Sequence, residues 1–163
     1  MDITFAPRGI LQIDDARIVY RNFAGEASAY NREGDRNFAV VIETEEQERA
    51  LVAEGWNVKT KPSRSDPDDI FRFLPVKIKF NDRGPAVYMV MGDKEVKLDE
   101  NNVKILDKAD IAKVELDIRP YDWEVNKKTG RSAYLSGMRV TCNVSRFELA
   151  HMAHEIEEGE RPF

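Results

Sequence analysis

AKVELDIRPYDWEVNKKTGRSAYLSGMRVTCNV, residues 112–144, alternates apolar and polar side chains on both sides of a central turn-forming segment. Strict alternation is typical of β-strands, whose successive side chains point to opposite faces of a sheet. The central segment, NKKTG (126–130), contains the asparagine and glycine that hairpin turns favour. The sequence therefore predicts two long antiparallel strands, 112–125 and 131–144, joined by this turn.

One register satisfies both faces of the predicted hairpin. When NKKTG forms the turn, Ile118 falls opposite Met138 on one face, and Asp117 falls opposite Arg139 on the other. The first pair is apolar and the second is oppositely charged, and both kinds of cross-strand pair stabilise a sheet. We therefore expect one face of the hairpin to line a core and the other to contact solvent.

Near the turn the apolar side chains change face. Tyr121 and Trp123 lie on the opposite face from Ile118, and the same register places them opposite Leu135 and Ala133. Two interpretations remain open at this point. The two rings either fill a small second core or face a ligand.

A proline and a glycine meet where this change of face occurs. Pro120 falls opposite Ser136, next to Gly137, and such a crossing predicts a bulge or a sharp coil of the strands. Bulges are a means by which a sheet closes into a barrel. With short strands elsewhere, we expect a mainly β fold with short helices, an OB-fold-like five-stranded barrel with a long C-terminal β-hairpin, in preference to a helix-backed open sheet.

The remaining elements are short. Thr44 and Gln47 form a capping-box pattern at the start of a predicted helix, 44–54, and Ser145 is placed to cap another near the end of the chain. We expect residues 1–147 to form one OB-like domain and residues 148–163 an acidic C-terminal helix or tail. The other predicted elements are strands at 17–23, 38–42, 56–59, 71–80, 86–91 and 95–98, a helix at 99–108 and a loop at 61–69.

Composition limits the class of protein. The chain has 163 residues, of which 42% are hydrophobic and 34% charged, which is enough for one core and too polar for a membrane span. The beginning of the chain lacks the pattern of a secretory signal, and Cys142 is its only cysteine. These features predict a cytoplasmic protein without membrane contact or a disulfide framework.

The candidates for catalysis are few. The two histidines, His151 and His154, have no HExxH context, so a solvated helical face explains them better than a metal site. Cys142 has apolar neighbours in the predicted sheet and is interpreted as a buried structural thiol. Neither GxGxxG nor GxxxxGK[ST] occurs. We therefore expect no enzymatic activity, no cofactor and no metal.

Cations and aromatic residues alternate repeatedly, which is the combination that single-stranded nucleic acid requires. The net charge is −5, but residues 148–163 account for −4 of it, so the remainder is nearly neutral. Each candidate alone could also be an ordinary surface or core residue. The predicted nucleic-acid-binding residues are Tyr20, Arg21, Tyr30, Arg32, Arg36, Lys77, Lys79, Arg119, Tyr121, Trp123, Lys127, Lys128, Arg131 and Tyr134.

The chain ends with EIEEGERPF, acid followed by Pro162 and Phe163. This ending resembles the C-terminal tip of bacterial single-stranded DNA-binding proteins, which recruits replication and repair partners. The resemblance implies partner binding by Pro162 and Phe163, although Arg161 occupies the place of the usual aliphatic residue. The alternative is a solvated end without a partner.

Four segments resemble a family of phage-encoded single-stranded DNA-binding proteins with an OB-like fold. They are RNFAGEASAYNREGDRNFAVVI (21–42), EGWNVK (54–59), FLPVKIKFNDRGP (73–85) and DIRPYDWEVNKKTGRSAYL (117–135). The resemblance implies a sequence-tolerant protein that coats single-stranded DNA in replication or recombination. Replication or recombination proteins are then the partners expected at the tail, and the sequence is compatible with a homo-oligomer. The alternative function is a phage module that binds a host protein.

Overall fold

The structure, a computed structural model, describes residues 1–143. Several predictions from the sequence lie outside the described residues: the helix after Ser145, the acidic tail at 148–163, the two histidines, and the partner-binding Pro162 and Phe163. Among the described residues, no helix is long and apolar enough to cross a lipid bilayer.

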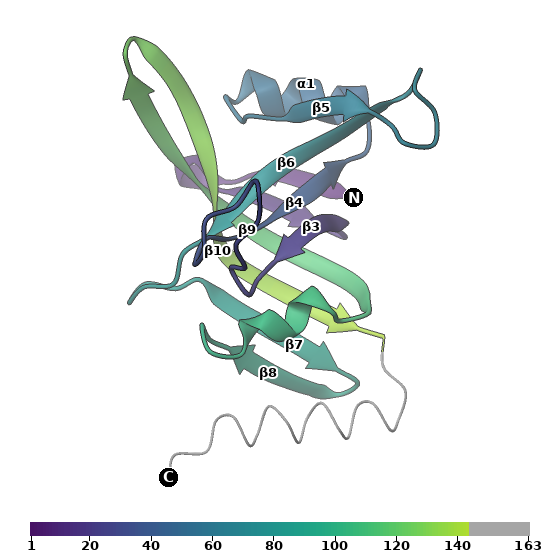
Figure 1. The fold of residues 1–163 in the computed structure, drawn as a ribbon, viewed down its shortest axis with the longest axis vertical. Coiled ribbons are helices and arrows are strands. Elements are labelled where there is room, and N and C mark those ends of the chain that lie inside the picture. Colours follow the sequence, from purple (N-terminus) through teal and green to yellow (C-terminus); the bar gives the residue numbers. More distant parts are fainter. Residues whose placement is uncertain (144–163) are drawn as a thin grey trace.

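Residues 1–143 form a single strongly coiled sheet with one α-helix (Figure 1). The main hydrogen-bonded path runs β1-β2-β9-β10-β6-β4-β3, with β5 paired to β6 and with β7 joining β10 to β8. The elements are β1 (Asp2–Phe5), η1 (Pro7–Gly9), β2 (Leu11–Asp14), β3 (Ile18–Asn22), β4 (Arg36–Ile42), α1 (Glu45–Ala53), β5 (Lys59–Pro62), β6 (Ile70–Ile78), β7 (Ala86–Met91), β8 (Lys94–Leu98), η2 (Val103–Asp107), β9 (Ile111–Val125) and β10 (Lys128–Cys142).

The mainly β, OB-like fold with a long C-terminal hairpin is confirmed, but the sheet has more strands than expected. We predicted a closed barrel of five strands, whereas residues 1–143 form ten strands in a sheet whose main path ends at β1 and β3. The first two strands, β1 and β2, were missed because each has only four residues. The predicted helix at 99–108 is the short 3₁₀-helix η2, and the predicted loop at 61–69 begins with the last residues of β5.

β9 and β10 form the predicted hairpin, which extends away from the rest of the sheet (Figure 1). Its turn is shorter than NKKTG, because Val125 pairs with Lys128 and only Asn126 and Lys127 lie between them. Both turn residues have positive φ, 52° and 67°, as a two-residue type I′ turn requires. The predicted register was therefore wrong along the whole hairpin: Ile118 pairs with Leu135 instead of Met138, and Asp117 with Gly137 instead of Arg139.

The shorter turn changes the neighbours of the two aromatic residues. Tyr121 lies opposite Ser132 and Trp123 opposite Gly130, whereas Ala133 and Leu135 face the core. The predicted bulge is confirmed, because the register shifts between Leu135 and Gly137. This extra residue allows the apolar side chains of β10 to point inward on both sides of the bulge.

The core contains only apolar side chains among the described residues. Leu74 and Val76 of β6 and Leu116 and Ile118 of β9 are at most 3% exposed. Helix α1 begins at the predicted Thr44 cap and lies on the core side of β6, where the Arg72 guanidinium contacts the Glu48 carboxylate at 2.8 Å. Among residues 1–143, helix α1 therefore leaves the opposite, outer face of β6 uncovered.

Candidate nucleic-acid interface

Tyr134 on β10 stands between two cations on the outer face of the sheet. The register pairs it with Arg119 of β9 on one side and with Lys77 of β6 on the other. The guanidinium carbon of Arg119 lies 5.0 Å from the centre of the tyrosine ring, and the Lys77 ammonium lies 5.8 Å from it. Both distances fall within the range of cation–π attraction.

Two further rings extend this group toward the hairpin tip. Tyr121 meets Tyr134 edge to face at 5.9 Å between ring centres and is 55% exposed. Trp123 is 38% exposed and lies over Gly130. These exposures exclude the second small core. We call Lys77, Arg119, Tyr121, Trp123 and Tyr134 the hairpin platform.

Other predicted cations surround the hairpin platform. Lys127 and Lys128 are exposed at the tip of the hairpin. Lys79 lines a hollow of about 350 Å³ together with Arg83 and Arg119, and its described lining contains no carboxylate. These side chains can contact phosphates on either side of the rings.

Arg131 lies on the other face of the hairpin. Its guanidinium donates hydrogen bonds to the Asp122 carboxylate at 2.7 Å and to the Glu54 carbonyl at 2.8 Å, and it lies over the Trp56 ring. The hydrogen bond from Arg131 lowers the pKa of Asp122. The structure therefore places Arg131 as a clamp between the hairpin and the end of α1, away from the hairpin platform.

Two other predicted arginines are occupied by backbone carbonyls. Arg21 donates to the carbonyls of Leu106 and Ala109, both at 2.8 Å, and so attaches η2 to β3. Arg36 donates to the carbonyl of Phe23 at 3.0 Å and to that of Glu100 at 3.0 Å. Both side chains hold loops in place.

Tyr30 and Arg32 belong to the loop between β3 and β4. Asn37 of β4 pairs with Lys77 and donates a 2.8 Å hydrogen bond to the Asn31 side chain, which holds this loop beside the hairpin platform. The Tyr30 side chain is fully exposed. Arg32 forms an ion pair with Asp35 at 3.7 Å.

Tyr20 belongs to a second group that sequence reasoning missed in part. Its ring contacts Phe71 and Phe73 edge to face, at 6.3 and 5.6 Å between centres, and Lys61 lies over all three rings. We call these four residues the Lys61 cluster. The signal was available, because alternation along β6 puts Phe71 and Phe73 on the face of Lys77.

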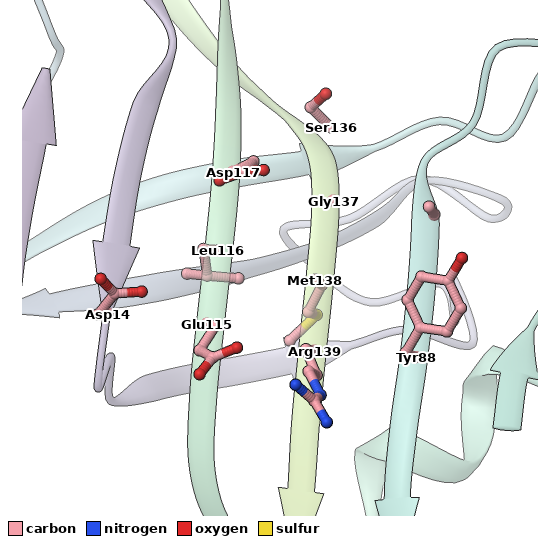
Figure 2. A pocket seen from close by; sticks show the side chains of 10 residues that line it. Asp14, Tyr88, Glu115, Leu116, Asp117, Ser136, Gly137, Met138 and Arg139 are labelled. Atoms are coloured by element: carbon pink, nitrogen blue, oxygen red, sulfur yellow. The ribbon is translucent and has the colours of Figure 1, made fainter. Parts of the chain in front are cut away.

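The outer face of the hairpin becomes acidic beyond the bulge (Figure 2). Asp14, Glu115 and Asp117 line a hollow there with Tyr88 and Arg139. Arg139 contacts the Glu95 carboxylate at 3.2 Å, so its charge is partly neutralised. Glu115 in turn contacts the Lys113 ammonium at 3.3 Å, so Asp14 and Asp117 make this end of the sheet less favourable to phosphate than the hairpin platform.

Two features of residues 1–143 bear on catalysis. No group of three or more His, Cys, Asp or Glu side chains in this part of the chain could hold a metal ion. Cys142 is buried, and burial raises the pKa of its thiol, which disfavours the reactive thiolate.

The model of one protein family matches residues 3–156, nearly the whole chain, and that family is described as "Putative phage ssDNA-binding domain". The chain belongs to this family. The resemblance to phage single-stranded DNA-binding proteins is thereby confirmed, whereas the likeness of the tail to the bacterial tip stays a prediction. No match was found among curated proteins.

Solved structures of a phage protein resemble this member of the phage ssDNA-binding family in fold. The single-stranded DNA-binding protein from bacteriophage Enc34 in complex with ssDNA matches with a TM-score of 0.58 and 12% identity, over 89% of this chain and 93% of that chain. A C-terminal truncation of the Enc34 protein matches with a TM-score of 0.56 and 11% identity, over 88% and 91% of the two chains.

Proposed function

We propose that this phage single-stranded DNA-binding protein holds unpaired DNA on the hairpin platform. The observation that carries the proposal is the row Lys77–Tyr134–Arg119, in which three adjacent strands place a ring between two cations on one exposed face. The Enc34 protein, whose fold is similar, has been solved in complex with ssDNA.

The chemistry of the hairpin platform favours binding without sequence preference. Bases stack on the faces of aromatic rings whatever their identity, and each stacked base contributes about 1–3 kcal/mol. Lys77 and Arg119, with Lys79, Lys127 and Lys128 nearby, neutralise phosphates, a contribution that weakens as salt rises. We therefore infer that the protein coats single-stranded DNA during phage replication or recombination, in the host cytoplasm.

Fluorescence anisotropy with labelled oligo-dT at low and moderate salt tests this proposal. We expect the unmodified protein to bind oligo-dT more weakly as salt rises. We expect Trp123→Ala to reduce this binding without changing the thermal unfolding of the protein. Tyr88→Leu is the matched control, because it removes a ring from the acidic hollow instead. Absence of binding at micromolar protein, or binding indifferent to salt, would overturn the proposal.

The tail supports a second proposal from the sequence alone: Pro162 and Phe163 recruit replication or recombination proteins. A pull-down from host lysate after nuclease treatment, with and without the last two residues, measures it. Capture that depends on these residues supports recruitment, and capture that is unchanged without them contradicts it.

A further inference from the structure

The Lys61 cluster lies at the far end of β6 from the hairpin platform. The Lys61 ammonium stands 4.7 Å from the centre of the Tyr20 ring, 5.6 Å from that of Phe71 and 5.8 Å from that of Phe73. Tyr20 is 50% exposed, and both phenylalanines are half-buried. The Lys61 cluster therefore combines partly exposed aromatic rings with a cation, as the hairpin platform does.

Both groups lie on the same face of the sheet. Lys61 of β5 pairs with Phe71 of β6, and Phe71, Phe73, Pro75 and Lys77 follow one another at every second position of that strand. Every second residue of a strand shares a face. At about 3.3 Å per residue, the four steps along the strand from Phe73 to Lys77 span about 13 Å.

The backbone at Tyr20 is arranged to present its ring there. Its φ is +54°, in the left-handed region that a bulky side chain rarely adopts, and the β3–β4 register shifts between Val19 and Asn22. A bulge of this kind redirects a side chain, and strained backbone tends to occur at functional sites. The strain turns an exposed ring toward Phe71 and Phe73.

The path between the two groups is uncharged, and acid lies beyond both of its ends. Pro75 on β6 and its partner Ala39 on β4 separate the groups on the outer face. Past the Lys61 cluster, the turn between β5 and β6 contains three aspartates and one arginine. Past the hairpin platform and its neighbouring cations Lys79 and Arg83, Asp14 and Asp117 line the acidic hollow. The excess of acid at both ends favours a polyanion on the path between the two groups.

We propose that the Lys61 cluster is a second base-stacking site, and that a DNA strand held on the hairpin platform runs along β6 to reach it. This inference rests on the proposed function. A base stacks on the Tyr20 and Phe73 rings in the place of the Lys61 ammonium. The four-carbon stem of the lysine then allows its charge to move to the phosphate of the same nucleotide, and the exposed Lys59 provides a second cation.

Oligo-dT of two lengths tests the inference by anisotropy. Site sizes on folds of this kind run from about 4 to about 16 nucleotides, so we use these two lengths. We expect Tyr20→Asn and Phe73→Leu to weaken binding of the long oligonucleotide by about 5-fold or more, the effect of losing one stacked base. The short oligonucleotide should bind these variants as before, because it occupies the hairpin platform, which has more cations nearby than the Lys61 cluster.

The choice of variants separates loss of the site from loss of the fold. Asparagine tolerates a positive φ, Phe73→Leu keeps an apolar side chain, and Lys61→Gln changes an exposed residue that cannot unfold the core. Trp123→Ala is expected to weaken both lengths. If the unmodified protein binds the long oligonucleotide and all three cluster variants bind it equally well, the second site is wrong and the proposed function stands. If the unmodified protein binds neither length, both are wrong.

Discussion

Trp123 lies directly across the hairpin from Gly130, so close that a β-carbon at position 130 would stand 2.3 Å from an atom of the indole ring. A glycine here lets the ring lie flat against the strand, with its outer side open to solvent. The Trp123 side chain thus loses its rotamer freedom when the protein folds, before a ligand binds. Such preorganisation favours affinity for the ligand.

Gly130→Ala should therefore displace the indole and weaken binding of oligo-dT by less than Trp123→Ala does. For Trp123→Ala we expect a loss of binding free energy of about 1–3 kcal/mol, the contribution of one stacked base, and for Gly130→Ala a smaller loss, both measured by anisotropy. Tryptophan emission should shift to the red, because the displaced indole of Trp123 becomes more exposed to water. The signal can be assigned to Trp123, since the other tryptophan, Trp56, is 3% exposed and will not contribute a change. Gly137→Ala is the control on the same strand, since a β-carbon there meets its nearest atom at 3.8 Å. Equal affinity of Gly130→Ala and the unmodified protein would contradict a stacking role for Trp123.

Arg119→Gln and Lys77→Gln should each lower both the affinity for oligo-dT and its dependence on salt. Each phosphate contact on a single strand contributes about 0.7 to the slope of log K against log salt. A titration at four or five salt concentrations measures the slope. Arg139→Gln removes the same charge from the same hairpin beyond the bulge, where Glu95 pairs with it, and should leave the slope unchanged. A slope that drops equally in all three variants would argue for a diffuse charge effect.

Lys127→Gly should weaken DNA binding while stabilising the fold. Lys127 occupies the second position of the type I′ turn with a φ of 67°, a conformation for which glycine is preferred. The substitution removes a cation from the tip and relieves the backbone at once. For Lys127→Gly we expect a higher melting temperature by circular dichroism and a lower affinity for oligo-dT by anisotropy. Lys127→Ala is the comparison, because it removes the same charge but keeps the backbone conflict. Unchanged affinity in both variants would remove the tip from the interface.

The Arg131–Asp122 clamp should stabilise the protein only when Asp122 is ionised. Because the hydrogen bond from Arg131 holds the folded-state pKa of Asp122 below its ordinary value of 3.8, the contribution is fully present above that value and is lost as pH falls through the lower, folded-state pKa. Asp122→Asn should therefore melt at a lower temperature than the unmodified protein at neutral pH. The difference should disappear in strong acid.

Glu124→Gln is the control for this clamp, since Glu124 lies on the same face of β9 and forms no ion pair with residues 1–143. A constant difference in melting temperature between the unmodified protein and Asp122→Asn across the whole pH range would show that the carboxylate charge is not the cause.

The sequence allowed the inner face of the fold to be predicted, because burial depends on a pattern that alternation displays directly. Leu116 and Met138 face the core together, and Phe23 and Phe38 stack in it at 5.5 Å between ring centres with at most 2% exposure. The register of the hairpin could not be obtained in this way. It depends on the left-handed backbone of Asn126 and Lys127, and lysine is an unusual residue for that conformation.

The candidate site was predicted in part for a similar reason. Aromatic rings and cations of the hairpin were expected to gather, and Tyr121, Trp123 and Tyr134 do so. In the sequence, Arg21 and Arg36 cannot be told apart from the cations of the hairpin. Their partners are backbone carbonyls, which carry no residue-specific signal and lie up to 88 positions away along the chain. The contribution of each predicted residue to DNA binding remains a prediction that the variants above measure.

Ser136 is the extra residue at the bulge of β10. On its tip side the even-numbered residues of β10 face outward, and on the other side the odd-numbered ones do. Deleting this single serine would leave every other residue of β10 on its present face, because Leu135 and Gly137 already pair with the consecutive residues Ile118 and Asp117. Only the bulge and its local bend of the strand would be lost. A relative that lacks this residue would therefore keep its aromatic residues on the same face, and is best aligned with a gap here.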